Sequence, residues 1–332
     1  MVEDRLLQAA AKRILEAIYE ADFLDASYGY RPGKGATAAV KDLTSTLRKG
    51  RYNYVVEADI RGFFDGIDHE WMIRMLGERV DDKSFLRLIQ KWLKAGILEP
   101  EGMTIHPLTG TPQGGVISPI LANIYLHYSL DIWFEKVVKP GLSGNATFFR
   151  YADDFVMFFE NENDANRFYS ALGKRLGKFG LELAPEKSRV ICFSHWNLKE
   201  CLPFEFLGFE FRRVQNPNYR MTMRRTSPKK QRQALQVFKL WLRENMHERT
   251  SDLIKGLNAK LRGYYNYFGM LGNSKSLASF FYRIKGLLFW TLNRRGQKRS
   301  YNWKEYEAML HGHGILWPRI VEKKTMQNVF QF

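Results

Sequence analysis

The feature that most constrains this chain is an acidic pair between two apolar runs. Asp153 and Asp154 follow Phe148-Phe149-Arg150-Tyr151-Ala152 and precede Phe155-Val156-Met157-Phe158-Phe159. Runs this rich in aromatic and β-branched residues, separated by polar residues, predict a β-hairpin with both carboxylates at its tip. Carboxylates beside so much apolar surface are costly unless a cation or hydrogen bonds compensate them, and clustered oxygen ligands suit Mg²⁺. The pattern therefore indicates part of a metal site.

A third carboxylate lies upstream on a strand of its own. The segment is Tyr54-Val55-Val56-Glu57-Ala58-Asp59-Ile60. With a side-chain period of two, Tyr54, Val56, Ala58 and Ile60 share one face, and Asp59 points to the other. Antiparallel pairing would bring Asp59 close to the acidic pair. Two Mg²⁺ ions about 3.5–4 Å apart, held by such carboxylates, support in-line attack of a hydroxyl on a phosphate. The chemistry predicted is phosphoryl or nucleotidyl transfer.

The alternative for the dipeptide alone is a solvated surface turn, because Asp is common in turns. Its neighbours in the sequence favour the metal site. Thr111-Pro112-Gln113-Gly114-Gly115-Val116-Ile117-Ser118-Pro119 is a glycine-rich turn that opens an apolar helix. Such a shape suits a segment lying under a base pair and a sugar, although a glycine turn by itself is a weak signal.

With these residues in view, the chain resembles the reverse transcriptases encoded by group II introns, the maturase proteins. Further segments match the family in its own order. They are Tyr28-Gly29-Tyr30-Arg31-Pro32-Gly33 (fingers), Glu57 to Asp65 (first palm motif), Thr111 to Pro119 (template–primer support), Tyr151-Ala152-Asp153-Asp154 (catalytic turn), Leu181 to Ser188, Phe206-Leu207-Gly208-Phe209 (primer grip) and Leu257 to Phe268 (thumb helix of maturase domain X). The resemblance covers nearly the whole chain.

The resemblance implies an α+β fold: a right-hand polymerase with fingers, an antiparallel palm sheet and an α-helical thumb, or domain X. It also implies roles for individual residues. Asp59, Asp153 and Asp154 would be catalytic and would hold two Mg²⁺ ions, for which Mn²⁺ could substitute, with the Ile60 carbonyl completing one site. The nucleotide would contact Arg31, Phe63, Phe64, Gln113 and Lys187. Primer and template would contact Gly114, Gly115, Tyr151, Leu207, Gly208, Arg262, Arg294 and Arg295.

Some of these roles have a plain alternative. Phe64, five positions after Asp59, is expected to stack under the incoming sugar as a gate against a 2′-hydroxyl, but it could simply be a core residue. Lys187 is expected near the leaving pyrophosphate, where a cation offsets developing charge. It could equally be a solvated charge. Arg31, expected at the triphosphate, could be an ordinary turn residue.

Charge is unevenly distributed along the chain. Of the net +16, residues 1–211 carry 26 Lys and Arg against 29 Asp and Glu, a net of −3. Residues 212–332 carry 25 against 6, a net of +19. Phosphate neutralisation by such a segment supplies affinity for nucleic acid that depends on salt and little on sequence. The expected partners are an RNA template, the RNA–DNA hybrid, dNTPs and group II intron RNA.

The same boundary predicts two domains, fingers and palm over 1–211 and a basic helical thumb over 212–332. A polar connection is expected from Arg212 to Ser227, followed by three helices. The first opens at Ser227-Pro228 and the second at Ser251. Leu277 to Leu292 form the stripe of the third. We expect Lys255, Lys260, Arg262 and Arg283 on the solvent or RNA face, and the basic run from Asn293 to Trp303 against RNA backbone.

Other features narrow the setting. No stretch of about 18 apolar residues and no signal peptide are present, so we expect a soluble, cytoplasmic and bacterial protein. Cys192 and Cys201 are too few for a disulfide framework or a zinc finger. The chain opens within what resembles the middle of the first fingers motif, so we expect a fragment, a misplaced start or a polymerase with reduced fingers. It ends without the paired His and Cys residues of a zinc endonuclease, so mobility by bottom-strand cleavage is not expected.

Three functions agree with these observations. The first is an RNA-directed DNA polymerase of the group II intron type with a splicing role. The second is a non-enzymatic maturase that binds intron RNA. The intact set of Asp59, Asp153 and Asp154 favours the enzyme, because a binding protein has no need to gather three carboxylates at one point. The third, a domesticated reverse transcriptase in bacterial defence, is neither selected nor excluded by the residues.

Overall fold

The computed structural model describes residues 2–94, 97–98, 104–105, 109–110, 115–194, 200–216, 219–295 and 300–323. The chain forms two compact units. The first consists of Met1–Leu207 and Arg212–Thr222, and the second of Gly208–Phe211 and Met223–Phe332. Among the helices of these described stretches, none combines the length and apolarity needed to cross a membrane.

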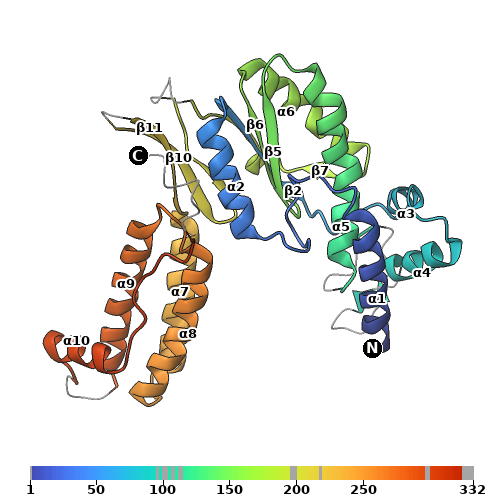
Figure 1. The fold of residues 1–332 in the computed structure, drawn as a ribbon. Helices are drawn as coiled ribbons and strands as arrows, with labels where there is room; N and C mark the ends of the chain where they lie inside the picture. Colours follow the sequence, from blue (N-terminus) through green and yellow to red (C-terminus); the bar gives the residue numbers. More distant parts are fainter. Residues whose placement is uncertain are drawn as a thin grey trace. The chain divides into compact units, whose positions relative to one another are not determined.

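The first unit is built on a four-stranded antiparallel sheet, in the order β5-β6-β1-β8 (Figure 1). Its strands are β1 (Tyr54–Ala58), β5 (Ala146–Tyr151), β6 (Asp154–Phe159) and β8 (Arg189–Cys192). Strand β1 is central, and Val55 pairs with Phe158 on one side and Ile191 on the other. The antiparallel palm sheet predicted from the sequence is therefore confirmed.

Helices cover the face of this sheet that the period-two pattern predicts to be apolar. Val56, Ala58 and Ile60 lie in the core there. The helices of the unit are α1 (Val2–Tyr19), α2 (Ala36–Lys49), α3 (His69–Gly77), α4 (Lys83–Lys94), α5 (Ser118–Leu126) and α6 (Glu162–Gly177). All except α2 contribute side chains to that core, whereas α2 lies beside β5. Burial of one continuous apolar layer is the main stabilising contribution to this unit.

Helix α5 continues into irregular turns. Two π-helical turns, η1 (His127–Asp131) and η2 (Phe134–Val138), are followed by the 3₁₀ turn η3 (Lys139–Gly141). The short elements β2 (Ile60–Arg61), β7 (Glu182–Leu183) and η4 (Pro185–Lys187) lie after β1 and before β8, and β3 (Ile97–Leu98) pairs with β4 (Thr104–Ile105). π-turns are uncommon and frequently accompany functional sites, which directs attention to η1.

The second unit is mainly helical. It contains α7 (Pro228–Glu244), α8 (Thr250–Phe268), α9 (Ser274–Leu292) and α10 (Trp303–Gly312). The apolar stripes read from the sequence are its core, including Leu257, Leu261 and Leu288. Helix α8 begins one residue earlier than expected, at Thr250, and α10 was not predicted. It is capped by Asn302, whose side chain and that of Glu305 each accept a backbone hydrogen bond from the other residue.

The expected polar connection from Arg212 to Ser227 is wrong. Residues 212–216 and 219–226 belong to a three-stranded sheet of β9 (Phe204–Phe206), β10 (Phe209–Asn216) and β11 (Tyr219–Thr226). Arginines made the segment look polar, but Arg213 and Arg224 are buried. Arg213 donates hydrogen bonds to the carbonyls of Leu47 and Tyr52, and Arg224 pairs with Glu322. Paired guanidinium groups are tolerated where unpaired ones are not.

Candidate active site

The predicted hairpin is present, with its turn at the acidic pair. Strands β5 and β6 pair antiparallel up to Tyr151 opposite Asp154, which leaves Ala152 and Asp153 as a two-residue loop. Ala152 has φ +56°, a left-handed conformation that is uncommon for a residue with a Cβ. The turn is therefore held in shape by its surroundings rather than by its own preference.

The fingers segment supports this turn from the edge of the sheet. The Tyr28 N–H donates to the Arg150 carbonyl, and the Arg150 N–H donates to the Ala26 carbonyl. Gly29 lies directly against the loop, because a Cβ at this position would come within 2.3 Å of the Ala152 nitrogen. No side chain fits there. Asn123 of α5 completes the contact by donating from Nδ2 to the Gly29 carbonyl at 2.6 Å.

Arg150 is the residue that the sequence reasoning missed. Its side chain is fully buried and forms two hydrogen bonds with Asp131, at 2.8 Å from Nε and 2.5 Å from Nη2. Its Nη1 donates to Asn123 Oδ1 and to the Ala152 carbonyl, both at 3.0 Å. The planar guanidinium thus links π-turn η1, α5 and the β5–β6 loop, which a lysine cannot do. A charged residue within an otherwise apolar strand was the available signal.

The antiparallel register between β1 and β6 places Asp59 at the level of the acidic pair. Ala58 pairs with Phe155, so the next residue on β1 reaches the level of Asp154 on β6. The Asp59 carboxylate forms an ion pair with the exposed Lys187, 2.6 Å from Oδ2 to Nζ. Its own charge acts on both carboxyl groups of the hairpin. The carboxylates of Asp59, just after β1, and of Asp153 and Asp154, at the tip of the hairpin, therefore share one electrostatic environment.

Both carboxyl groups of the loop are harder to ionise than usual. Burial, with a further contribution from the Asp59 charge, raises the pKa of Asp153. Desolvation by the surrounding protein raises the pKa of Asp154 to about 7, although the residue keeps solvent access. The charges of Asp153, Asp59 and Glu57 add to this rise, and a hydrogen bond from the Leu207 backbone opposes it. A bound cation would relieve this repulsion.

The donor set fits a hard divalent cation. Carboxylate oxygens are the ligands that Mg²⁺ and Mn²⁺ prefer. In the described part of the chain, no three His, Cys, Asp or Glu side chains converge closely enough to enclose an ion. The Asp59 carboxylate is instead paired with the Lys187 ammonium group. Metal binding would therefore release Asp59 from Lys187 and draw the carboxylates together.

The raised pKa of Asp154 predicts a pH-dependent stability. Between its ordinary value of 3.8 and about 7, the folded protein binds more protons than the unfolded chain, so stability falls as pH rises through this window. In EDTA, Asp154→Asn should be more stable than the parent by about 1 kcal/mol at pH 8, a value reduced by solvent screening, and by little at pH 4. Urea unfolding at both pH values measures this. A stability difference that is equal at both would contradict it.

Two residues predicted to contact the nucleotide are buried within the first unit. Phe63 is buried in the core of the first unit. Arg31 is buried as well: Nε and Nη2 donate to the Glu20 carboxylate, and Nη1 donates to the carbonyls of Leu24 and Ser27. Every guanidinium nitrogen of Arg31 is therefore in use within the protein, and its contact with the triphosphate stays a prediction. Phe64 is only partly buried and lies edge-on against Phe63, with ring centroids 5.3 Å apart.

The remaining palm residues are placed as follows. The Ile60 side chain is in the core, and its carbonyl stays a predicted ligand. Tyr151 is partly buried, 6.2 Å from Tyr30 between ring centroids. Gly115 immediately precedes Val116, whose N–H donates to Gln8 of α1. Gln113 and Gly114 lie outside the described residues.

The predicted primer grip is the loop between β9 and β10. Leu207 and Gly208 both have positive φ, +50° and +76°, which is characteristic of a type I′ hairpin turn. The Leu207 backbone donates a hydrogen bond to the Asp154 carboxylate. This turn therefore holds one of the hairpin carboxylates directly, a contact that the sequence does not reveal.

On the second unit, Arg262 and Arg294 are exposed, as a nucleic-acid contact requires. Arg295 is partly buried and donates from Nη1 to Thr250 Oγ1 at 3.4 Å. Its Nε and Nη2 have no hydrogen-bond partner among the described residues. Lys255 and Arg283 are also exposed, while Lys260 lies over the Trp241 ring. The basic residues between 296 and 299 are outside the described residues.

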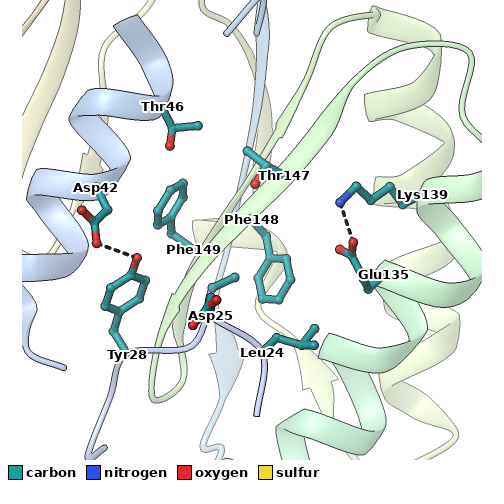
Figure 2. A pocket seen from close by; sticks show the side chains of 11 residues that line it. Leu24, Asp25, Tyr28, Asp42, Thr46, Glu135, Lys139, Thr147, Phe148 and Phe149 are labelled. Carbon is teal, nitrogen blue, oxygen red and sulfur yellow. Dashed lines mark hydrogen bonds and ion pairs between the residues drawn. The ribbon is translucent and has the colours of Figure 1, made fainter. Parts of the chain in front are cut away.

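A separate hollow of about 360 Å³ lies at the outer edge of β5 (Figure 2). Phe148 and Phe149 form part of its wall, and α2 supplies Asp42 and Thr46. Tyr28 donates its hydroxyl to Asp42 at 3.0 Å. Glu135 and Lys139, four positions apart in the η2–η3 segment, form an ion pair in the same lining, as Figure 2 shows. Because these polar groups satisfy one another and none of the three catalytic-site carboxylates lines it, this hollow is not the active site.

Comparison with known proteins identifies the family. The sequence model described as reverse transcriptase (RNA-dependent DNA polymerase) matches residues 1–211, more than half of the chain. The chain belongs to the reverse transcriptase family. A second model, the group II intron maturase-specific domain, matches residues 229–311. The chain therefore matches both a reverse transcriptase model and a group II intron maturase model, and its α+β fold class is as predicted. Divalent metal dependence is general in the family.

Curated relatives agree with this assignment. Group II intron-encoded protein LtrA of Lactococcus lactis is 45% identical over 125 residues, 37% of this chain and 20% of LtrA. Protein YkfC of Escherichia coli is 32% identical over 184 residues, 47% of this chain and 48% of YkfC. The chain thus spans a fifth of LtrA and about half of YkfC.

Solved structures share the fold. Telomerase from Candida albicans, in complex with a fragment of telomeric RNA, covers 92% of this chain with a TM-score of 0.50 and 13% identity. Fifty-five per cent of that telomerase chain is matched. Apo telomerase from Candida tropicalis gives a TM-score of 0.51 at 13% identity, covering 93% of this chain and 54% of that one. At such identities the similarity concerns the fold alone.

Proposed function

We propose that this chain extends a primer on an RNA template by two-metal nucleotidyl transfer, as an RNA-directed DNA polymerase of the group II intron type. The observation that carries the proposal is the β5–β6 loop, which presents Asp153 and Asp154 beside Asp59 on the neighbouring strand. Two Mg²⁺ ions, replaceable by Mn²⁺, would be held by these carboxylates and the Ile60 carbonyl. They would supply a Lewis acid at the α-phosphate and at the leaving pyrophosphate.

Other residues of the chain would position the carboxylates and contact the substrates. Gly29 and Arg150 hold the loop that carries the carboxylates, and the Leu207 backbone orients Asp154. Lys187, once released from Asp59, would face the pyrophosphate that leaves. Phe64, which is not completely buried, would contact the sugar of the incoming dNTP.

A role in intron splicing is part of the same proposal. The match of residues 229–311 to a maturase-specific domain and the net charge of +19 over residues 212–332 support group II intron RNA as the partner. The bacterial relatives support a bacterial cytoplasm as the setting. A maturase that only binds RNA is the second candidate, and the match to the maturase domain is the observation that favours it.

Metal binding and polymerisation test the proposal together. Mg²⁺ at 100 times its dissociation constant should stabilise the protein by about 2.7 kcal/mol, which corresponds to several degrees in Tm. The Asp153→Ala/Asp154→Ala variant should lose this shift. Primer extension on an RNA template should need dNTPs and Mg²⁺ and occur only with the parent. A parent that binds RNA without extending the primer or responding to metal would favour the RNA-binding maturase.

Phe64 provides a test of nucleotide selection. Phe64→Ala should raise incorporation of ribonucleotides relative to deoxynucleotides by about tenfold or more, because the ring would no longer exclude the 2′-hydroxyl. Competition between one dNTP and its rNTP in single-nucleotide extension measures the ratio. An unchanged ratio would remove Phe64 from this role and leave it as a packing residue against Phe63.

A further inference from the structure

A groove on the outer face of the second unit has no role in the chemistry described above. It has a volume of about 540 Å³ and lies between α7 and α9. Each helix contributes residues spaced i, i+3, i+4 and i+7, which form one continuous face. The lining residues are Arg232, Leu235, Gln236 and Lys239 of α7, and Arg283, Gly286, Leu287 and Trp290 of α9.

The composition of the groove combines an aromatic ring with cations. Trp290 is 63% exposed, so much of its ring is open to solvent. Arg232, Lys239 and Arg283 are all exposed, and within the described stretches none of the three forms an ion pair. Helix α9 contains no acidic residue, and α7 contains only Glu244 at its last position. The lining of the groove therefore combines apolar side chains with positive charge and contains no acidic residue.

Gly286 supplies an independent observation. Glycine within a helix costs about 1 kcal/mol relative to alanine. At some glycines of this chain a close contact explains the choice, as at Gly256, where a Cβ would meet the Trp241 ring at 2.8 Å. At Gly286 a Cβ would meet nothing within 4 Å, so packing does not require glycine. What the missing side chain does provide is depth in the groove beside Trp290.

We propose that the α7–α9 groove binds an unpaired segment of RNA, with a base stacked on Trp290 and phosphates at Arg232, Lys239 and Arg283. Stacking on an exposed aromatic ring flanked by cations is the general way in which single strands are bound without sequence preference. The positive charge favours a polyanion over an apolar peptide or another copy of this basic chain. The inference takes RNA as the partner from the proposed function, but it does not depend on polymerisation.

The experiment is a fluorescence anisotropy titration of a labelled oligouridylate, (rU)₁₂, at two salt concentrations. Trp290→Ala should weaken binding about tenfold, whereas Trp290→Phe, which keeps a stacking ring, should restore most of the affinity. Tyr282→Ala is the matched control, because Tyr282 is 69% exposed on the same helix and does not line the groove. Its affinity should be unchanged. Equal binding by the Trp290→Ala and Tyr282→Ala variants would overturn the proposal.

A substitution at Gly286 distinguishes an effect on RNA binding from an effect on the stability of the fold. Gly286→Ala should stabilise the protein towards urea and yet weaken (rU)₁₂ binding, two effects that a purely structural role would not combine. The Asp153→Ala/Asp154→Ala variant should bind (rU)₁₂ like the parent. Retained groove binding in a parent without polymerase activity would therefore refute the proposed catalysis alone. Competition by polyglutamate as effective as that by unlabelled RNA would overturn the assignment of RNA as the occupant.

Discussion

Asp153→Ala is expected to reduce the rate of primer extension by about 10³-fold or more while the protein stays folded. A metal ion contributes several kcal/mol of transition-state stabilisation, and each 1.36 kcal/mol corresponds to tenfold in rate. Asp153 occupies the loop between β5 and β6, where burial and the Asp59 charge already raise its pKa. Removing it relieves that repulsion, so thermal stability without metal should not fall.

Single-turnover extension of a labelled primer on an RNA template, at saturating dNTP and Mg²⁺, measures this effect. Asp81→Ala is the matched control, because Asp81 is an exposed aspartate of the same unit outside the site. It should extend the primer at the parental rate, and both variants should bind template equally. An Asp153→Ala protein that retained a tenth of the parental rate would show that the metal site is built from other groups.

Arg150→Ala is expected to destabilise the protein by about 3–5 kcal/mol, the cost of leaving a buried charge without its partner. Both side chains of the Arg150–Asp131 pair are completely buried. His127, the other titratable neighbour, cannot replace the guanidinium, because burial lowers its pKa and keeps the ring neutral. The mutation also removes the donor to the Ala152 carbonyl, so the catalytic loop would lose its shape.

Urea unfolding gives the free energy, and two variants make the result interpretable. Arg61→Ala breaks an exposed arginine's pairs with Glu182 and Glu186 and should cost less than about 1 kcal/mol. Adding Asp131→Ala to Arg150→Ala removes the orphaned carboxylate and should recover part of the loss. If Arg150→Ala cost no more than Arg61→Ala, the buried pair would not stabilise this fold.

The elements that could be predicted were those whose buried face shows in the spacing of apolar residues along the chain. The period of two around Asp59 correctly placed Val56 and Ala58 in the core, and the two apolar runs gave the β5–β6 hairpin. Helical stripes located α7, α8 and α9, and cap signals placed the starts of α7 and α8 to within a residue. These patterns succeed because a strand or helix shows its buried face in the spacing of its own residues.

The error over residues 212–227 has a physical cause. The arginines of β10 and β11 made this segment look polar, because residue type alone does not tell whether a side chain finds a buried partner. Arg31 is satisfied by Glu20, and Arg213 by carbonyls that lie more than 150 residues away in the chain. Long-range pairing of this kind leaves no period in the sequence.

The sequence by itself therefore determined the family, the order of the motifs and the hairpin that carries Asp153 and Asp154. Only the tertiary structure decided which groups hold that hairpin: Arg150 with Asp131, Gly29 against the Ala152 backbone, and the Leu207 amide on Asp154. The reason is that period and propensity act between residues a few positions apart, whereas a buried charge is tolerated only where distant segments bring it a partner.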